Sequence, residues 1–241
     1  MKNTLAIAGK EFKSYLASPM AYVVTGIFLA ATGFFFGTSP LRQIPAWYTE
    51  TSLSDFLPAA AFLILLFAPL LTMRLLAEER KLGTMELLLT APVRDSEVIL
   101  GKFLGSVFIL TVMLALTLYY PLLLKIFGDP DIGPIVTGYI GLLLIGYAAL
   151  AIGIFASSLT SNQIVAAVVA IGISLALYFV GFASTFLPKA LGDVIGYFSL
   201  SRYFPDFMRG IIDTRGIVYY LSICGLFIFL AVRSLENSRW N

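Results

Sequence analysis

The chain alternates long apolar stretches with short polar segments. A helix needs roughly 20 residues to cross the ~30 Å hydrocarbon core of a bilayer, and six stretches reach or approach that length. The six stretches are residues 20–37, 56–73, 103–124, 135–156, 164–186 and 217–232. None of them contains Asp, Glu, Lys or Arg. The pattern predicts an all-α polytopic membrane protein with six transmembrane helices.

The composition narrows the class of function. Of the 241 residues, 59% are hydrophobic and 12% are charged, and the mean hydropathy is +0.91. Because spans and short connectors take up almost the whole length, we expect one transmembrane domain over residues 1–241 and no separate catalytic domain. The net charge of +2 is too small to favour nucleic acid as a partner.

The absence of some residue types excludes further classes. Histidine is missing, which removes the commonest general base and the commonest metal ligand. We therefore expect no catalytic residue, no metal and no cofactor on this chain. Ion-coupled transporters usually keep an ionisable group at membrane depth, and the six stretches have none. Self-powered transport is disfavoured for that reason.

Residues 1–19 have the pattern of an interfacial helix. Apolar residues fall within one arc at helical spacing: Leu5, Ala8, Phe12, Tyr15 and Leu16. The basic residues point elsewhere: Lys2, Lys10 and Lys13. Pro19 then permits a change of direction into the first span. A positively charged leader that only orients the first span is the alternative. Lys10, Phe12, Lys13 and Tyr15 are the candidate interfacial residues.

The distribution of basic residues predicts the topology. Three lysines precede the first span, and five basic residues lie between spans two and three, whereas the loop between spans one and two has only Arg42. The amino and carboxyl termini are therefore expected in the cytoplasm. Residues 187–216 carry four basic residues yet fall outside in a six-span chain. We place them outside because the amino-terminal bias is stronger.

Residues 187–216 are also amphipathic. Two sets of apolar residues recur at helical spacing, namely Leu187, Leu191, Val194, Ile195 and Phe198, and then Phe204, Phe207, Met208, Ile211 and Ile212. Two short helices at the outer interface are predicted, with Pro205 in the first turn of the second. A packed lid without a transport role is the alternative.

The polar segment "EERKLGTMELLLTAP" (residues 78–92) interrupts two uncharged stretches. Its charged start predicts that the second helix protrudes from the membrane, and Gly83 and Thr84 break or cap it. Glu86 then suits the first turn of a short helix that Pro92 ends. Asp95 is expected to cap the next helix, which starts near Ser96 and runs through Lys102 into span three.

This segment carries a family resemblance. Twelve residues in order resemble the permease subunits of ABC-2 type transporters: Glu78, Glu79, Arg80, Gly83, Thr84, Glu86, Leu88, Leu89, Pro92, Glu97, Gly101 and Lys102. The stretch after the leader and the ending "RYFPDFMRGIIDTRGIVYY" followed by "RW" look most like the branch of gliding-motility-associated and nitrous-oxide-reductase maturation permeases.

The resemblance implies the mechanism and the partners. Such permeases sit in the bacterial plasma membrane, form homodimers or heterodimers and bind cytoplasmic ABC ATPase subunits that carry ATP and Mg. The segment between spans two and three is their coupling helix. That role is carried here onto Glu78, Glu79, Arg80, Gly83, Thr84, Glu86 and Leu87. An outer-face accessory protein is a further candidate partner.

The resemblance also implies the function and leaves one alternative open. The expected function is a transport permease, in particular an exporter, that uses ATP hydrolysed on another chain. The sequence has no Gly-rich phosphate loop, because "LGKFLG" lacks the first glycine of that motif. The alternative is an ATP-driven mechanical or assembly complex that moves no solute. Scattered polar residues within the spans, such as Thr111, Thr117, Ser157 and Ser174, are interpreted as helix-packing residues rather than as an active site.

Overall fold

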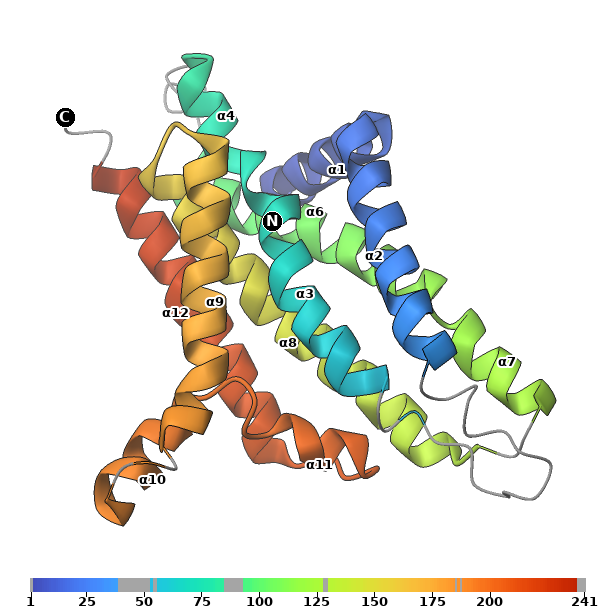
Figure 1. Cartoon of the computed structure of the whole chain (residues 1–241). Helices are drawn as coiled ribbons and strands as arrows, with labels where there is room; N and C mark the ends of the chain where they lie inside the picture. Colours follow the sequence, from blue (N-terminus) through green and yellow to red (C-terminus); the bar gives the residue numbers. More distant parts are fainter. Residues whose placement is uncertain are drawn as a thin grey trace.

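The computed structural model describes residues 2–38, 53, 56–84, 93–127, 130–184, 186 and 188–237, and this part of the chain contains helices and no strand. The helices are α1 (Lys2–Ala17), α2 (Pro19–Thr38), α3 (Phe56–Thr72), α4 (Arg74–Lys81), α6 (Asp95–Leu116), α7 (Tyr119–Phe127), α8 (Ile132–Leu159), α9 (Gln163–Ser184), α10 (Lys189–Tyr197), α11 (Phe204–Met208) and α12 (Thr214–Asn237). Figure 1 shows how they are arranged.

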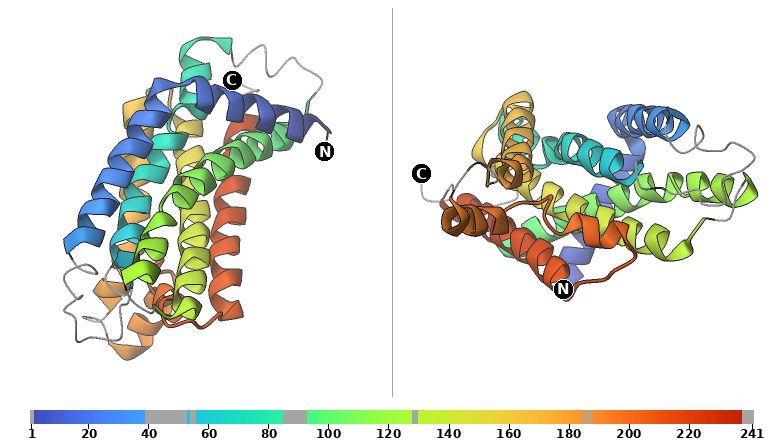
Figure 2. Two further views of the ribbon diagram at one scale, coloured as in Figure 1. Left: turned by 90° about the vertical axis from the view of Figure 1, so that its right-hand side faces the viewer. Right: turned by 60° about the horizontal axis from the view of Figure 1, so that its bottom comes forward.

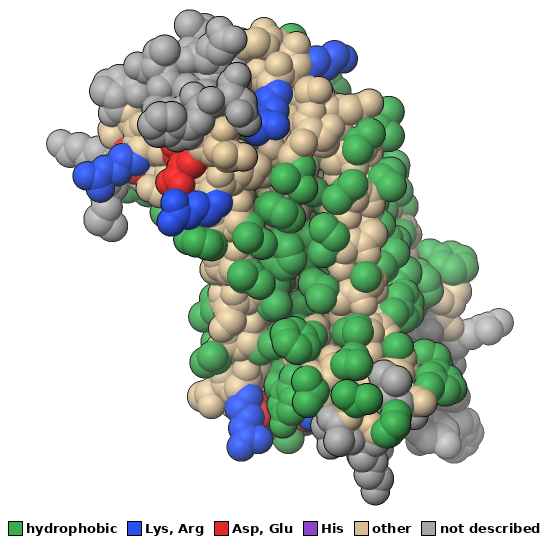
Figure 3. Space-filling view, turned by 90° about the vertical axis from the view of Figure 1, so that its left-hand side faces the viewer, with side chains coloured by type: hydrophobic (Ala, Val, Ile, Leu, Met, Phe, Trp, Pro, Cys, Tyr) green, Lys and Arg blue, Asp and Glu red, His purple; other side chains and the backbone are tan. Residues whose placement is uncertain are grey.

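Among the described residues, six helical segments are long and apolar enough to cross a membrane. They are Pro19–Thr38, Phe56–Lys81, Asp95–Ile126, Ile132–Leu159, Gln163–Ser184 and Thr214–Asn237. On the face in Figure 3, hydrophobic side chains cover the middle of the molecule, while charged side chains gather at its two ends. The protein is therefore an all-α polytopic membrane protein, as the apolar pattern predicts.

Helix α8 is the centre of the bundle. In its apolar window 78% of residues are buried, against 22% in α9. It packs against α3, α6, α9, α11 and α12. Glycine allows α8 to pack this closely against its neighbours, since a Cβ at Gly146 would lie 2.5 Å from Leu110 Cδ2 of α6. With no aqueous driving force between helices in lipid, such close approach is a main source of stability.

The bundle has two chemically different ends, which we call the α4 end and the α11 end. Helix α1 lies across the α4 end, and α12 finishes at the same end (Figure 2). Ser18 alone separates α1 from α2, and Pro19 begins α2. Proline fits there because a first helical residue needs no intrahelical N–H bond.

The third span is interrupted near the α11 end. Helix α6 ends at Leu116 and α7 begins at Tyr119, with Pro121 in its first turn. Proline has no N–H to donate to the carbonyl of Thr117, four residues earlier. The Tyr139 hydroxyl of α8 donates to that carbonyl at 3.0 Å. The interruption is thus supported by a partner from another helix, as backbone at membrane depth requires.

The α11 end differs from the sequence pattern in one element. The spacing of apolar residues predicts a helix that reaches Ile212, but α11 ends at Met208, and Ile211 and Ile212 are exposed. The reason is Gly210, whose φ of +86° breaks the helical path. Pro205 does lie in the first turn of α11, and Phe204 and Phe207 are buried.

Helix α10 projects from the bundle and packs against α9 (Figure 1). Leu191, Val194 and Phe198 on and beside it are more than half exposed. Much of the apolar face that the sequence pattern assigns to this helix is therefore exposed, while Ile195 on it is half-buried.

Candidate functional site

Three helices meet at a buried ion pair at the α4 end. The Lys102 ammonium of α6 donates to Glu11 Oε1 of α1 at 2.7 Å and to Glu79 Oε1 of α4 at 2.8 Å. The Lys102 side chain is 2% exposed, and those of Glu11 and Glu79 are 13% and 22% exposed. We call Glu11, Lys102 and Glu79 the ion-pair triad. Charges this buried are stable only when paired, so the triad ties α1, α4 and α6 together.

Two glycines allow α1 to reach the triad. Gly101 and Gly105 lie one helical turn apart on α6, and both face α1. A Cβ at Gly101 would lie 2.7 Å from Ile7 Cβ, and one at Gly105 would lie 2.8 Å from Glu11 Cβ. Any side chain at either position would push α1 away from α6. The Gly-Lys pair of the sequence motif therefore has a physical role: the glycine admits α1 and the lysine binds its carboxylate.

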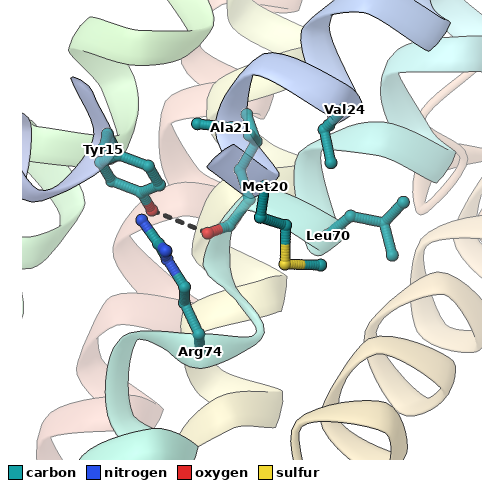
Figure 4. A pocket seen from close by; sticks show the side chains of 7 residues that line it. Tyr15, Met20, Ala21, Val24, Leu70 and Arg74 are labelled. Carbon is teal, nitrogen blue, oxygen red and sulfur yellow. Dashed lines mark hydrogen bonds between the residues drawn. The ribbon is translucent and has the colours of Figure 1, made fainter. Parts of the chain in front are cut away.

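A second contact joins α1 to the end of α3. The Tyr15 hydroxyl donates to the Leu71 carbonyl at 2.7 Å, and the Arg74 guanidinium lies over the Tyr15 ring at 4.8 Å from its centroid. Arg74 also donates to Ser18 Oγ at 2.6 Å. Figure 4 shows Tyr15 and Arg74 beside a gap of about 10 Å³. Tyr15 is 1% exposed, and burial raises the pKa of its hydroxyl.

Helix α4 presents the charged residues of the polar segment. Leu75, Leu76 and Ala77 are buried, whereas Glu78 and Arg80 are half-buried and Lys81 is exposed. Ala77 packs with Ala166 and Ala167 of α9. The apolar start of α4 is therefore held in the bundle, and its charged end leaves it.

Gly83 ends α4 as the sequence predicts. Its φ is +71°, a conformation that side-chain-bearing residues rarely adopt, and its N–H donates to the Arg80 carbonyl at 3.3 Å. Thr84 follows and is exposed, with its hydroxyl 3.3 Å from the Glu79 carbonyl oxygen. Glu86 and Leu87, with the rest of 85–92, lie outside the described residues.

Helix α6 begins one residue earlier than the sequence favours. Asp95 is its first residue rather than its cap, and Arg94 holds the cap position with an extended backbone. The Glu97 carboxylate accepts from the Arg94 N–H at 3.2 Å and from the Asn3 amide of α1 at 3.2 Å. Glu97 can accept the Arg94 N–H because a carboxylate in the third helical position reaches back to the N–H of the cap residue. The Asn3 bond adds another contact between α1 and α6.

The interfacial residues do not share one environment. Tyr15 is buried, Phe12 packs edge-on against Phe108 with ring centroids 4.2 Å apart, and Lys10 and Lys13 are exposed. Leu5 and Leu16, which the helical arc places with Tyr15, are 67% and 45% exposed. Helix α1 therefore packs one side against α6. A second side, with Leu5 and Leu16, is apolar and exposed, and a third side, with Lys10 and Lys13, is basic and exposed.

A polar pocket of about 250 Å³ opens beside the triad. It is lined by Lys10, Glu11, Ser14, Arg74, Leu75, Glu78, Glu79, Leu82 and Lys102. Three of the candidate residues thus meet here, namely Lys10 from α1 and Glu78 and Glu79 from α4, together with Lys102 of the sequence motif. No group of three or more His, Cys, Asp or Glu side chains able to hold a metal occurs in the part of the chain that the structure describes.

Sequence reasoning missed three residues of this site. Glu11 was hidden between two lysines, and only the tertiary contact with α6 reveals its role. Arg74 enters the sequence analysis only as one of the basic residues at the polar exit of span two, without a partner. Ser157 was interpreted as a packing residue, but its hydroxyl bonds the backbone where α3 meets α4. Pairing across 56 to 91 positions in sequence leaves no local pattern that could have shown these contacts.

The chemistry of the site is that of a mechanical junction. The charges of Glu11, Lys102 and Glu79 are engaged with one another, and they connect three helices at one end of a membrane bundle. A displacement of α4 would therefore also displace α1 and α6 or break their ion pairs.

Comparison with known proteins identifies the family of the chain. The family model described as "ABC-2 family transporter protein" matches residues 5–196, which is more than half of the chain. A search of curated proteins gave no match. The family match covers α1, α4, the ion-pair triad and five of the six candidate spans. The chain belongs to the ABC-2 family of transporter proteins, and it is a transmembrane permease subunit of an ABC transporter.

Proposed function

We propose that the chain is the membrane subunit of an ATP-driven exporter in the bacterial plasma membrane. A separate ABC ATPase binds ATP and Mg and acts on the α4 end, which faces the cytoplasm with both termini. A second permease subunit, identical or homologous, completes the pathway. The family membership supports the ATPase partner, and the basic residues at the α4 end support the orientation.

The ion-pair triad is the observation that carries this proposal. Glu79 lies on α4, four residues before Gly83, and is bound to the buried Lys102 of α6 at 2.8 Å. Lys102 is also bound to Glu11 of α1 at 2.7 Å. A partner that pulls or pushes the segment after α4 therefore acts on a membrane-crossing helix and on the helix that lies across the bundle end.

The coupling surface consists of the charged end of α4 and the polar segment that follows it. Glu78, Arg80, Gly83 and Thr84 lie at or beyond the charged end of α4, and Glu86 and Leu87 follow them along the chain. ATP closes the two ATPase subunits, the coupling segments move with them, and the two permease subunits rearrange to open a path outward.

Charge reversal at the coupling surface tests the proposal. We expect Glu86→Lys to weaken co-purification with the ATPase about tenfold, equivalent to ~1.4 kcal/mol, because an interface charge meets a partner of the wrong sign. The stimulated ATP hydrolysis of the reconstituted complex should fall with it. Glu236→Lys is the matched control, since Glu236 is a 40% exposed carboxylate near the end of α12.

The two outcomes are distinct. Loss of binding in Glu86→Lys with normal binding in Glu236→Lys supports the assignment. Normal assembly and normal turnover in Glu86→Lys contradict it. Vesicles that contain the complex and ATP then show whether a solute leaves the compartment that holds the ATPase.

A further inference from the structure

Ser157 of α8 is inserted into the helix that leads to α4. The hydrogen-bond ladder of Phe56–Lys81 is interrupted between α3 and α4, at Met73. The N–H groups of Leu76 and Ala77 donate to Ser157 Oγ at 3.1 and 3.0 Å, and the Ser157 hydroxyl donates to the Met73 carbonyl at 2.8 Å. A side chain that enters a helical ladder in this way is a recognised cause of helix distortion.

The serine uses its full hydrogen-bonding capacity on this backbone. A hydroxyl donates one bond and accepts two, and all three are made to Met73, Leu76 and Ala77. Ser157 is 0% exposed, so no water replaces these bonds. The neighbouring Ser158 is also 0% exposed, but its hydroxyl donates only within α8, to the Phe155 carbonyl at 2.7 Å.

The close approach of α8 to α3 brings the serine into the ladder. Gly153 lies one turn before Ser157, and a Cβ there would lie 3.2 Å from Thr72 Cβ. On the other side of the interruption, Tyr15 of α1 bonds the Leu71 carbonyl. The α3–α4 junction is therefore held by side chains from two helices, α1 and α8.

The backbone at the junction has a second arrangement within reach. In a continuous helix, Leu76 N–H would donate to the Thr72 carbonyl and Ala77 N–H to the Met73 carbonyl. Met73 already has helical torsions, with φ −54° and ψ −31°, so closing the ladder does not require this residue to leave the helical region. The Ser157 hydroxyl can then turn to a carbonyl of its own helix, as that of Ser158 does. Both arrangements satisfy the polar groups, which is what a two-state element requires.

We propose that Ser157 is a positioning residue for α4: its hydroxyl holds the α3–α4 ladder open, and its withdrawal closes the ladder and rotates α4. The consequence for the triad is direct, because Glu79 lies two residues after Ala77 and moves relative to Lys102. The role in transport rests on the proposed function, whereas the positioning of α4 does not.

The first experiment uses the permease alone. Spin labels are placed on Lys81→Cys, at the exposed end of α4, and on Arg233→Cys of α12, which is 63% exposed, in a Cys224→Ser background. Pulsed electron–electron double resonance gives the distribution of distances between the two spin labels. We expect Ser157→Ala to shift the main distance, and Ser158→Ala to leave it as in the parent. Superimposable distributions for Ser157→Ala and the parent would overturn the proposal.

A matched pair isolates the hydroxyl and remains informative if the alanine variant does not fold. Thr and Val have the same shape and differ in the hydroxyl. We expect Ser157→Thr to keep the parent distance and Ser157→Val to show the shifted one. The same distance in both variants would show that the hydroxyl does not position α4.

The second experiment adds the ATPase. Ser157→Val should reduce the permease-dependent stimulation of ATP hydrolysis roughly fivefold or more, and Ser157→Thr should restore it. A shifted α4 distance with unchanged stimulation supports the positioning role and counts against the proposed coupling function. An unshifted distance overturns the positioning role whatever the ATPase assay gives.

Discussion

Lys102 is the residue on which the α4 end depends most. It is a lysine with 2% exposure, placed between two glutamates from other helices. Removal of one partner from a buried pair costs about 3–5 kcal/mol, while replacement of all members by neutral groups is often neutral or stabilising. The triad is therefore better explained by specificity of helix arrangement than by stability alone.

This difference predicts a pair of results at the residue scale. Lys102→Met leaves two half-buried carboxylates without their cation, so the melting temperature in detergent should fall by roughly 6–20 °C. The triple variant Glu11→Gln, Lys102→Met, Glu79→Gln should recover most of that loss. Arg233→Met is the control for a charge removed from an exposed pair, which is worth about 0–1 kcal/mol. Equal melting of Lys102→Met and the parent would contradict the account.

The residues of the triad differ in how far sequence could predict them. Glu79 and Lys102 belong to the motif that resembles the family, so their importance was predicted, although their direct contact was not. Glu11 belongs to no motif. A pairing between residues 91 positions apart depends on the path of the chain through the bundle, which local patterns do not contain.

At the scale of elements, the ion-pair triad can form only if α1 packs closely against α6. A Cβ added at Gly105 would lie 2.8 Å from Glu11 Cβ. A Cβ added at Gly172 of α9 would have no heavy atom within 4 Å. These two glycines have opposite surroundings, which makes them a matched pair.

The prediction for this element concerns local opening of α1. Gly105→Ile should overpack the contact by about 1–3 kcal/mol and loosen α1. Trypsin cleavage after the exposed Lys10 and Lys13 should then be faster in intact, detergent-solubilised protein. Gly172→Ile should be cleaved at the parent rate. Equal cleavage in both variants would mean that α1 does not depend on this close approach.

The elements themselves were largely predictable, for physical reasons. Spans follow from the length of uncharged apolar stretches, and Gly83 ends α4 because glycine tolerates a positive φ. The interruption at Met73 was not predicted, because it involves Ser157 of α8. The interruption near Thr117 was not predicted either, although Pro121 marks it in the sequence and Tyr139 of α8 bonds the carbonyl there. The length of α11 was overestimated, because the apolar spacing continues past Gly210 although the helix does not.

At the scale of the whole molecule, the bundle has two different ends that one helix connects. The triad lies at the α4 end, while the interrupted third span and the projecting α10 lie at the α11 end. Helix α6 continues from Lys102 towards the interruption at Thr117, so it is the element that connects them. The family match supports the permease role of the bundle and does not distinguish the gliding-motility or nitrous-oxide-reductase branch.

The central claim is that the triad transmits the action of the ATPase to the α11 end. The most direct measurement labels Ile126→Cys of α7 and Phe186→Cys after α9, which are 74% and 79% exposed, in the Cys224→Ser background. Their distance is measured in the complex with ATPase, without nucleotide and after trapping with ATP and vanadate. The account predicts a nucleotide-dependent change in the parent, and loss of that change in the neutral triple variant while the ATPase still co-purifies. An identical nucleotide-dependent change in the triple variant would contradict it.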